Sequence, residues 1–340
     1  MNEEQRTEQE EIDEHNLSMW YHLLLWLIVI FLWWKWRDGE NLDDVDPEGK
    51  YVFITGCDSG FGKLAALTFD RRGFQVIGGC LTERGAKELK EESSHKLQTV
   101  LLDVTNSDNI KQVAEQVKKE VGEHGLWGLI NNAGVMGPSA PTDWLRIEHF
   151  RAPIEVNLMG LINVTLNMLP LVKKAKGRIV NVTSIGGVLA ICSGGYCPSK
   201  FGAEAFTNNL RQDMKPFGVK VSCIQPGLFK TELSDRIRVI KEKMAIWTSL
   251  PPIIQQQYGE HYLKEDAIKK ERLVKMCQNS NLSLVVNCME HALMSKYPQT
   301  HYSAGMDAKF LWIPLSKMPV SVQDYILMKN KVKLVNPNAE

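Results

Sequence analysis

The sequence predicts an α/β fold in which seven parallel strands form one doubly wound sheet with helices on both faces. Three observations support it. A glycine-rich turn follows the first apolar run, short apolar runs alternate with longer helix-like segments, and no Gly/Pro/Ser-rich linker interrupts the chain after residue 48. Alternation at this scale is typical of a parallel sheet with right-handed crossovers. We therefore expect one domain of roughly 290 residues, although domains of this length often split.

The first strand and the turn after it suit a dinucleotide. Tyr51–Thr55 is apolar, β-branched and aromatic, which predicts a buried parallel strand. Gly56, Gly60 and Gly62 follow, and then Lys63–Arg72 is helix-like. The glycines permit a tight turn, and the amides at the helix start can bind a pyrophosphate. The spacing G-x-x-x-G-x-G differs from the commoner G-x-G-x-x-G, so an ordinary strand–helix turn is the alternative.

The rest of the chain supplies the other strands and helices. Six further apolar runs have the length of strands: Gln75–Leu81, Leu97–Leu102, Leu126–Asn131, Gly177–Val182, Val219–Gln225 and Lys309–Ile313. The longer segments between them predict helices: Asn106–Val121, Ile147–Val172, Lys200–Pro216 and Leu282–Lys296. The count of strands gives the predicted seven-stranded sheet.

Tyr196 and Lys200 form the main candidate for acid–base chemistry. They are one helical turn apart, so both side chains lie on one face of a helix. A phenol has a pKa of about 10, and a nearby ammonium favours its ionised form. Ser184, twelve residues before Tyr196, adds a hydroxyl. A Y-x-x-x-K pair alone is weak evidence, but its position after a glycine-rich turn favours hydride-transfer chemistry.

In this order the motifs resemble the short-chain dehydrogenase/reductase family over essentially all of residues 49–315. The matching positions are Thr55–Gly62, Asn131-Asn132-Ala133-Gly134, Asn157, Ser184, Tyr196 with Lys200, and Pro226-Gly227. Within the family, Ile54–Gly62, Ala140–Trp144 and Pro226–Thr231 resemble the microsomal retinol and 3α-hydroxysteroid dehydrogenases. The resemblance implies a Rossmann-type fold, a nicotinamide cofactor and a retinoid or steroid substrate. Many relatives dimerise through the two long helices, so a homodimer is also expected.

The resemblance also implies a role for each matching residue. Tyr196 would exchange the alcohol proton, and Ser184 would bind the substrate oxygen beside it. Lys200 would lower the pKa of Tyr196 and bind the nicotinamide ribose, and Asn157 would anchor a water for proton relay. The positions expected around the cofactor are Thr55, Gly56, Asp58, Ser59, Gly60, Phe61, Gly62, Asp103, Asn131, Ala133, Gly134, Tyr196, Lys200, Pro226, Gly227 and Thr231. The hydride chemistry belongs to the nicotinamide.

The choice between NAD and NADP depends on the end of the second strand. An acidic residue there usually binds the adenosine ribose, but this strand ends Gly78–Thr82 and is followed by Glu83 and Arg84. Arg84 could meet a 2′-phosphate, or both residues simply begin a solvated helix. The glycine loop has no basic residue and the resembling subgroup mostly uses NAD, so we expect NAD, with NADP as the alternative. Asp103 would contact adenine by resemblance, or serve only as a turn carboxylate.

The N-terminus predicts a membrane anchor. Residues 1–18 hold seven acids against Arg6, which predicts a disordered polar tail. Residues 19–36 are mostly apolar, with Trp and Tyr at both ends, as in a single spanning helix. A cleaved signal peptide is the alternative, but it lacks a basic start and a small-residue cleavage site. Lys35 and Arg37 follow the almost wholly apolar run, Met19–Trp34, so the catalytic domain is expected on the cytosolic side of the endoplasmic reticulum membrane.

Two later segments bear on the substrate. Leu228–Gln278, hereafter the insertion, carries many apolar side chains that predict an apolar alcohol beneath it, unless they only pack amphipathic helices together. The C-terminal extension, residues 316–340, continues an apolar stretch that Pro314 and Pro319 interrupt, so it is too broken to span a bilayer but could graze one. Lys329, Lys331 and Lys333 follow as a small basic tail.

Composition narrows the remaining functions. Forty basic and forty acidic residues give a net charge of zero and no reason to expect nucleic-acid binding. The histidines show no metal-ligand spacing, and the seven cysteines show neither such spacing nor a paired framework, so no catalytic metal is expected. The leading hypothesis is a membrane-anchored oxidoreductase that moves a hydride between NAD(H) and all-trans-retinol or a 3α-hydroxysteroid. A dehydrogenase of a small hydroxy acid such as 3-hydroxybutyrate, and a non-catalytic lipid-binding protein, are the alternatives.

Overall fold

The computed structural model describes residues 18–31, 45–232, 236–329 and 331–337. The chain divides into two compact units, Met1–Asp44 and Val45–Glu340. Almost all of the predicted acidic tail lies outside the described residues, as do Lys35 and Arg37, which carried the predicted orientation.

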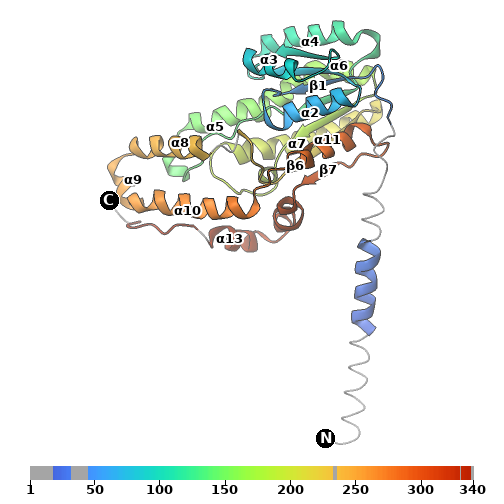
Figure 1. Cartoon of the computed structure of the whole chain (residues 1–340). Coiled ribbons are helices and arrows are strands. Elements are labelled where there is room, and N and C mark those ends of the chain that lie inside the picture. Colours follow the sequence, from blue (N-terminus) through green and yellow to red (C-terminus); the bar gives the residue numbers. More distant parts are fainter. Residues whose placement is uncertain (1–17, 32–44, 233–235, 330, 338–340) are drawn as a thin grey trace, which may run out of the picture. The chain divides into compact units, whose positions relative to one another are not determined.

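The first unit contains one described helix, Ser18–Phe31, which covers most of the predicted anchor. All of its residues are exposed, and it is drawn in blue in Figure 1. A helix of this length covers about 21 Å, less than the ~30 Å of a bilayer core, and residues 32–36 lie outside the described part. Within the described residues one helix, Ile147–Lys174, is long and apolar enough to cross a membrane, but it belongs to the core of the second unit. Membrane anchoring therefore stays a prediction.

The second unit is built on the predicted seven-stranded parallel sheet (Figure 1). The strands are β1 (Tyr51–Thr55), β2 (Gln75–Cys80), β3 (Leu97–Leu101), β4 (Gly128–Asn131), β5 (Arg178–Val182), β6 (Lys220–Pro226) and β7 (His301–Ala304). Their order in the sheet is β3-β2-β1-β4-β5-β6-β7, and every neighbouring pair is parallel. The order reverses between β1 and β4, and ligands of such sheets bind at the carboxyl ends of the strands beside this reversal.

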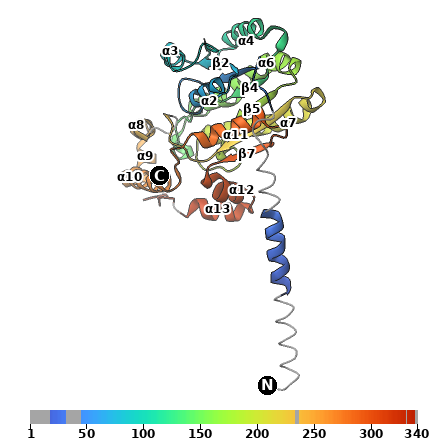
Figure 2. The ribbon, with the colours of Figure 1, turned by 45° about the vertical axis from the view of Figure 1, so that its right-hand side comes forward.

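Two hydrophobic layers hold helices on the two faces of this sheet (Figure 2). One face carries α2 (Gly60–Arg71), α3 (Glu83–Glu91) and α11 (Ser283–Met294); the other carries α4 (Ser107–Val121), α6 (Leu161–Lys174) and α7 (Tyr196–Met214). In β1, Val52 and Ile54 belong to the first layer and Phe53 to the second, as expected when successive side chains point to opposite faces. The doubly wound fold is confirmed.

The other described elements are short or lie outside these layers. They are α5 (Ile147–Ile154), α8 (Arg236–Thr248), α9 (Pro252–Tyr258), α10 (Glu260–Cys277), α12 (Ile313–Ser316), α13 (Val320–Met328), the 3₁₀ turns η1 (Gly122–His124), η2 (Thr142–Trp144), η4 (Ile185–Gly187) and η5 (Lys215–Phe217), and the π-helical turns η3 (Glu155–Gly160) and η7 (Ala308–Trp312). The predicted long helix Ile147–Val172 thus corresponds to α5, η3 and α6 in succession.

The predicted last strand, Lys309–Ile313, is wrong. This segment is helical, because Ala308 and Trp312 are buried four residues apart while Phe310 between them is exposed. The true last strand is β7, whose sequence His-Tyr-Ser-Ala looks too polar for a core strand. Only Tyr302 and Ala304 of β7 are buried, an alternation of period two that suits a strand at the edge of a sheet.

Candidate active site

The residues predicted to carry the chemistry lie together at the carboxyl edge of the sheet. α7 begins at Tyr196, four residues earlier than the sequence predicts, so Tyr196 and Lys200 occupy its first two turns. The Lys200 Nζ atom lies 5.9 Å from the centre of the Tyr196 ring and donates a hydrogen bond of 2.9 Å to the Val182 carbonyl at the end of β5. Burial lowers the pKa of Lys200 to about 8, and electrostatic interactions with Cys223 and Glu204 oppose that shift.

The protein's own groups raise the pKa of Tyr196. Burial is the main cause, the neighbouring thiols Cys192 and Cys197 add to it, and the hydrogen bond with Ser184 opposes it. The sequence predicts the reverse direction, because it places an ammonium beside the phenol. In the structure that ammonium is itself buried and directed to a backbone carbonyl, so the desolvation of the phenolate outweighs its attraction.

Ser184 reaches this position because η4 follows β5 directly. Its hydroxyl caps η4 by accepting a hydrogen bond of 3.0 Å from the Gly186 amide. A Cβ atom on Gly186 would lie 3.1 Å from Cε1 of Tyr196, so a glycine here lets the turn lie against the tyrosine ring. The close packing holds Ser184 at the tyrosine hydroxyl.

Asn157 lies inside the π-helical turn η3, a distortion that redirects side chains and is frequent at functional sites. Its Oδ1 accepts from the Val135 amide at 2.8 Å, and its Nδ2 donates to the Val135 carbonyl at 2.8 Å and to Ser199 Oγ at 2.9 Å. A Cβ atom on Gly134 would lie 3.1 Å from Asn157 Oδ1 and 3.6 Å from Lys200 Nζ. Asn157 and Lys200 therefore flank the same small residue.

The glycine-rich turn is a backbone cradle that larger residues would fill. Gly56 has a φ of +72°, and a Cβ there would lie 2.8 Å from Cα of Ala133. A Cβ on Gly62 would lie 2.1 Å from the Gly56 carbonyl oxygen. Ser59 precedes α2 but makes no side-chain capping bond to it; its hydroxyl donates to Glu232 at 2.8 Å. The turn and the amides at the start of α2 thus fit the pyrophosphate of a dinucleotide.

Three residues predicted at the cofactor have hydrogen-bond partners within the protein. Thr55 Oγ1 accepts from the amides of residues 132 and 133, which ties β1 to β4. Asn131 Nδ2 donates to Thr165 and Asn181 on neighbouring elements. Asp103 Oδ1 accepts from the amide and the hydroxyl of Thr105, which is the turn role that the sequence left open. These side chains shape the edge of the sheet.

Asp58 supplies the acidic group that the second strand lacks. Its carboxylate accepts from the Leu81 amide at 2.8 Å, and from the Thr82 amide at 2.9 Å and hydroxyl at 2.7 Å. A negative charge therefore lies at the end of β2, although it comes from the glycine-rich turn. Arg84, the alternative ligand for a 2′-phosphate, has an 86% exposed side chain and lies 3.7 Å from Glu88.

The segment after β6 lies against the glycine-rich turn. The Phe229 and Phe61 rings pack edge to face with centres 5.4 Å apart, and Thr231 lies beside Gly60. A Cβ on Gly227 would lie 2.2 Å from Asp307, whose carboxylate accepts a hydrogen bond of 2.8 Å from the Leu228 amide. Pro226 ends β6 itself. The predicted positions after β6 and those of the turn therefore share one region.

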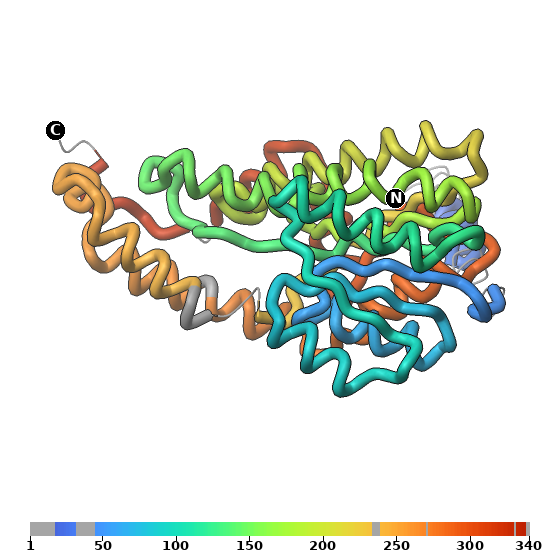
Figure 3. The backbone as a smooth tube through the Cα atoms, turned by 90° about the horizontal axis from the view of Figure 1, so that it is seen from above, coloured from blue at the N-terminus to red at the C-terminus, as the bar shows by residue number. Residues whose placement is uncertain are grey.

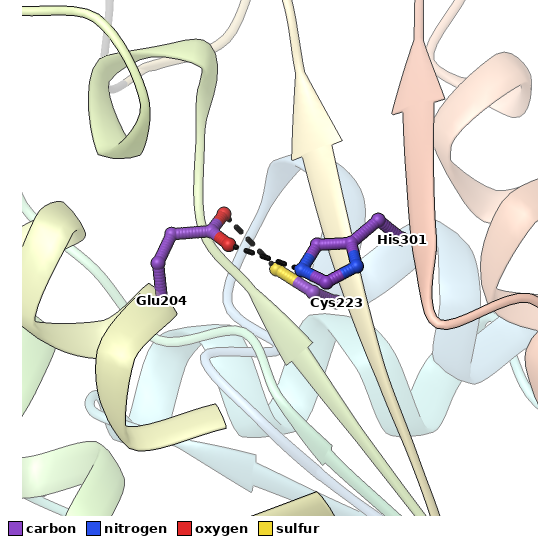
Figure 4. Close-up of side chains that lie close together, drawn as sticks. All are labelled: Glu204, Cys223 and His301. Atoms are coloured by element: carbon purple, nitrogen blue, oxygen red, sulfur yellow. Dashed lines mark hydrogen bonds and ion pairs between the residues drawn. The ribbon is translucent and has the colours of Figure 1, made fainter. Parts of the chain in front are cut away.

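Sequence reasoning missed Glu204, one turn beyond Lys200 on α7. Figure 4 shows its carboxylate directed at Cys223 and His301, from β6 and β7. Oε1 accepts from Thr183 Oγ1 at 2.5 Å, from Cys223 at 3.1 Å and from Gln225 at 3.0 Å. Burial opposes its ionisation, but the hydrogen bonds hold the pKa of Glu204 below its usual value. The spacing of four from Tyr196 to Lys200 to Glu204 could have identified it.

This cluster also brings together side chains of metal-binding type, which the sequence did not predict. The ligand atoms of Glu204, Cys223 and His301 lie within 4.8 Å of one another. Hydrogen bonds occupy this carboxylate in the structure, because Thr183, Cys223 and Gln225 all donate to Glu204 Oε1. The chemistry therefore favours a hydrogen-bonded carboxylate beneath Lys200.

The aromatic residues of the insertion mainly pack on one side chain, Trp144 of η2. Its ring centre lies 5.0 Å from that of Trp247, 4.9 Å from that of Tyr258 and 5.6 Å from that of Tyr262. The Tyr258 hydroxyl donates to Asp143 at 2.7 Å. Figure 3 shows the orange insertion helices beside the green segment that includes α5. These residues therefore pack against η2, and the cover over the substrate stays a prediction.

The fold and this arrangement define an oxidoreductase of the α/β class that uses a nicotinamide dinucleotide, and the chain belongs to the short-chain dehydrogenase/reductase family. Residues 50–241 match the family described as short chain dehydrogenase. Human dehydrogenase/reductase SDR family member 9 is 58% identical over 93% of this chain and 100% of its own length.

The chain is also similar to relatives named retinol dehydrogenase and hydroxysteroid dehydrogenase, and to a solved structure. Mouse retinol dehydrogenase 5 is 47% identical, covering 91% of this chain and 96% of its own, and rat 17-beta-hydroxysteroid dehydrogenase type 6 is 48% identical, covering 93% and 98%. A short-chain dehydrogenase from Streptomyces avermitilis shares the fold, with a TM-score of 0.64 at 23% identity, covering 82% of this chain and 97% of its own.

Proposed function

We propose that this protein interconverts an apolar lipid alcohol and its carbonyl form, all-trans-retinol or a 3α-hydroxysteroid, with NAD(H) as cosubstrate. The observation that carries the proposal is the grouping of Ser184, Tyr196, Lys200 and Asn157 at the carboxyl edge of the sheet, beside the glycine cradle. The relatives named retinol and hydroxysteroid dehydrogenases support the substrate class.

The nicotinamide, when bound, supplies the hydride acceptor or donor and, in its oxidised form, a positive charge. The chain positions the proton. Ser184 and Tyr196 hold the substrate oxygen between their hydroxyls, and Tyr196 takes the proton during oxidation or donates it during reduction. A positive charge in the site is what the phenol needs, because burial alone keeps it protonated.

In this proposal Lys200 binds the nicotinamide ribose and exchanges protons with the part of the site that contains Tyr196. With its pKa near 8, it can gain and lose a proton close to neutral pH. Asn157, beside it across Gly134, orients the route by which that proton reaches solvent. Thr55, Gly56, Ser59, Gly60, Phe61, Gly62, Ala133, Gly227 and Thr231 form the walls of the proposed cofactor site.

Asp58 supports NAD over NADP. Its carboxylate lies at the end of β2, where a 2′-phosphate would meet a like charge. Arg84 is exposed and close to Glu88, which supports the view that it belongs to a solvated helix.

We further propose that the protein is anchored in the endoplasmic reticulum membrane, with its catalytic unit facing the cytosol. The exposed apolar helix Ser18–Phe31 supports the anchor, and exposed Val320, Tyr325 and Met328 on α13 support contact with lipid. Exposed apolar residues on the two long helices, including Leu166 and Phe201, support the proposed dimer.

The test is turnover by the full chain in detergent, followed through the absorbance of reduced nicotinamide. NAD and NADP are each offered with all-trans-retinol, androstanediol and 3-hydroxybutyrate. We expect turnover of the retinoid or the steroid with NAD. Comparable rates on hydroxybutyrate would instead favour the hydroxy-acid dehydrogenase, and NADH binding without turnover of any alcohol would favour the lipid-binding protein.

A further inference from the structure

Two cysteines flank the proposed catalytic tyrosine in contact with each other. Cys192 lies in the loop between η4 and α7, and Cys197 follows Tyr196 in the first turn of α7. Their Sγ atoms are 3.3 Å apart and hydrogen-bonded. Cys192 is partly exposed, whereas Cys197 is buried. The pair therefore has one sulfur that a reagent can reach and one that it cannot.

The environment of Cys197 favours a thiolate. The hydrogen bond from Cys192 and the backbone amides of Ile191 and Cys192 lower the pKa of Cys197 to about 7, although burial opposes this. The start of α7, a 19-residue helix, adds a favourable dipole. Cys57 and Cys223 show the contrast, because burial raises the pKa of both. Of these buried sulfurs, Cys197 is the one suited to thiol–disulfide exchange.

We propose that Cys192 and Cys197 are a site of reversible disulfide formation that switches off the adjacent tyrosine. A low-molecular-weight disulfide, R–S–S–R, is the oxidant. Cys192 loses a proton and attacks one of its sulfurs, which releases the first thiolate and leaves Cys192–S–S–R. The Cys197 thiolate then attacks Cys192 Sγ and releases the second. The protein loses two protons and two electrons, and the oxidant becomes two thiols.

The new bond would disturb Tyr196 because the tyrosine lies within the ring that it closes. The sulfurs must approach from 3.3 Å to about 2.05 Å. Gly194 and Gly195 cannot easily absorb the movement, since added Cβ atoms there would lie 2.5 Å from the Pro138 carbonyl oxygen and 2.6 Å from that of Phe150. The shift therefore falls on the first turn of α7.

The activity readout rests on the proposed function, whereas disulfide formation does not. The experiment treats the full chain in detergent with oxidised glutathione after removal of reductant. Trypsin releases both cysteines in one peptide, Ile179–Lys200, whose mass reports the loss of two hydrogens. We expect that loss together with a fall in turnover of roughly 10²-fold, reversed by dithiothreitol.

Two variants separate this site from other thiols. Cys192→Ser should have the activity of the reduced wild type and resist oxidised glutathione. Cys288→Ser, altered at a half-buried thiol on α11, should remain sensitive. Equal inactivation of Cys192→Ser, an unchanged peptide mass, or full activity of the disulfide form would each overturn the proposal. A reduced wild type that turns over no alcohol would instead contradict the proposed function, and the peptide mass would still decide whether the disulfide forms.

Discussion

The carboxyl edge of the sheet and the insertion are built in different ways. At the edge, short hydrogen bonds to the backbone hold the side chains of Lys200, which bonds to Val182, and Asn157, which bonds to Val135. The insertion is held by aromatic packing around Trp144 and by a few polar contacts such as Tyr258 to Asp143. We expect changes at the edge to alter the chemical step. On the sequence-based prediction that the insertion covers the substrate, changes in the insertion should instead alter substrate binding.

The largest expected effect comes from Tyr196→Phe at the edge. The variant keeps the ring packed against Gly186 but has no proton to exchange, so kcat should fall by about 10²–10⁴-fold. NADH binding, measured by fluorescence titration, should remain close to that of the wild type. A variant that keeps wild-type turnover would remove Tyr196 from the mechanism, and one that loses NADH binding would indicate structural damage.

Asp58→Asn should change cofactor choice without changing the catalytic groups. The amide keeps the acceptor oxygen for Thr82 but loses the negative charge at the end of β2. We expect the preference for NAD over NADP, measured as a ratio of kcat/KM values, to fall by about tenfold or more. Arg84→Ala is the matched control and should leave the ratio unchanged. The reverse pattern would assign selectivity to the arginine.

Glu204→Gln tests the buried carboxylate beneath the edge. The Glu204 charge raises the pKa of Lys200, so its removal should lower that pKa further below its normal value. If the ammonium is the active form, wild-type activity falls as pH rises through about 8. In the variant this alkaline limb of kcat/KM should move to lower pH, by roughly one unit.

His301→Gln provides the control for that experiment, because it removes the ring near Glu204 and leaves the carboxylate in place. The alkaline decrease in kcat/KM of this variant should occur at the same pH as in the wild type. An unmoved limb in Glu204→Gln would mean that the carboxylate is only structural, and an equal shift in both variants would assign the limb to the network as a whole.

The same contrast explains what the sequence could predict. The parallel sheet and the convergence of Ser184, Tyr196 and Lys200 follow from local patterns, namely apolar runs, glycine spacing and one helical turn. The position of β7 does not follow from local patterns. Its burial alternates along the strand, whereas Lys309–Ile313 has the apolar composition of a strand. β-Strand propensity favours the segment that is helical in the structure. Packing at the edge of the sheet determines which segment forms the last strand.

Long-range hydrogen bonds account for the other differences. Asp58 lies 23 residues from Leu81, and Glu204 lies 21 residues from Gln225, so no local pattern pairs them. The direction of the Tyr196 pKa also depends on burial, which a spacing of four residues does not reveal. Sequence identifies the groups at the edge, and the fold determines their partners and their charge.

The smallest expected effect lies in the insertion, at Tyr258→Phe. The change removes the hydrogen bond to Asp143 and leaves the ring beside Trp144, so the free energy of unfolding should fall by only about 1 kcal/mol. The sequence predicts that the insertion covers the substrate without carrying the reacting groups; on that prediction KM for the lipid alcohol should rise a few-fold while kcat stays unchanged. Asp143→Asn, which removes the charge and keeps an acceptor, should give a smaller rise. A fall in kcat with constant KM would show that the insertion positions the reacting groups, and the two regions would then form a single catalytic unit.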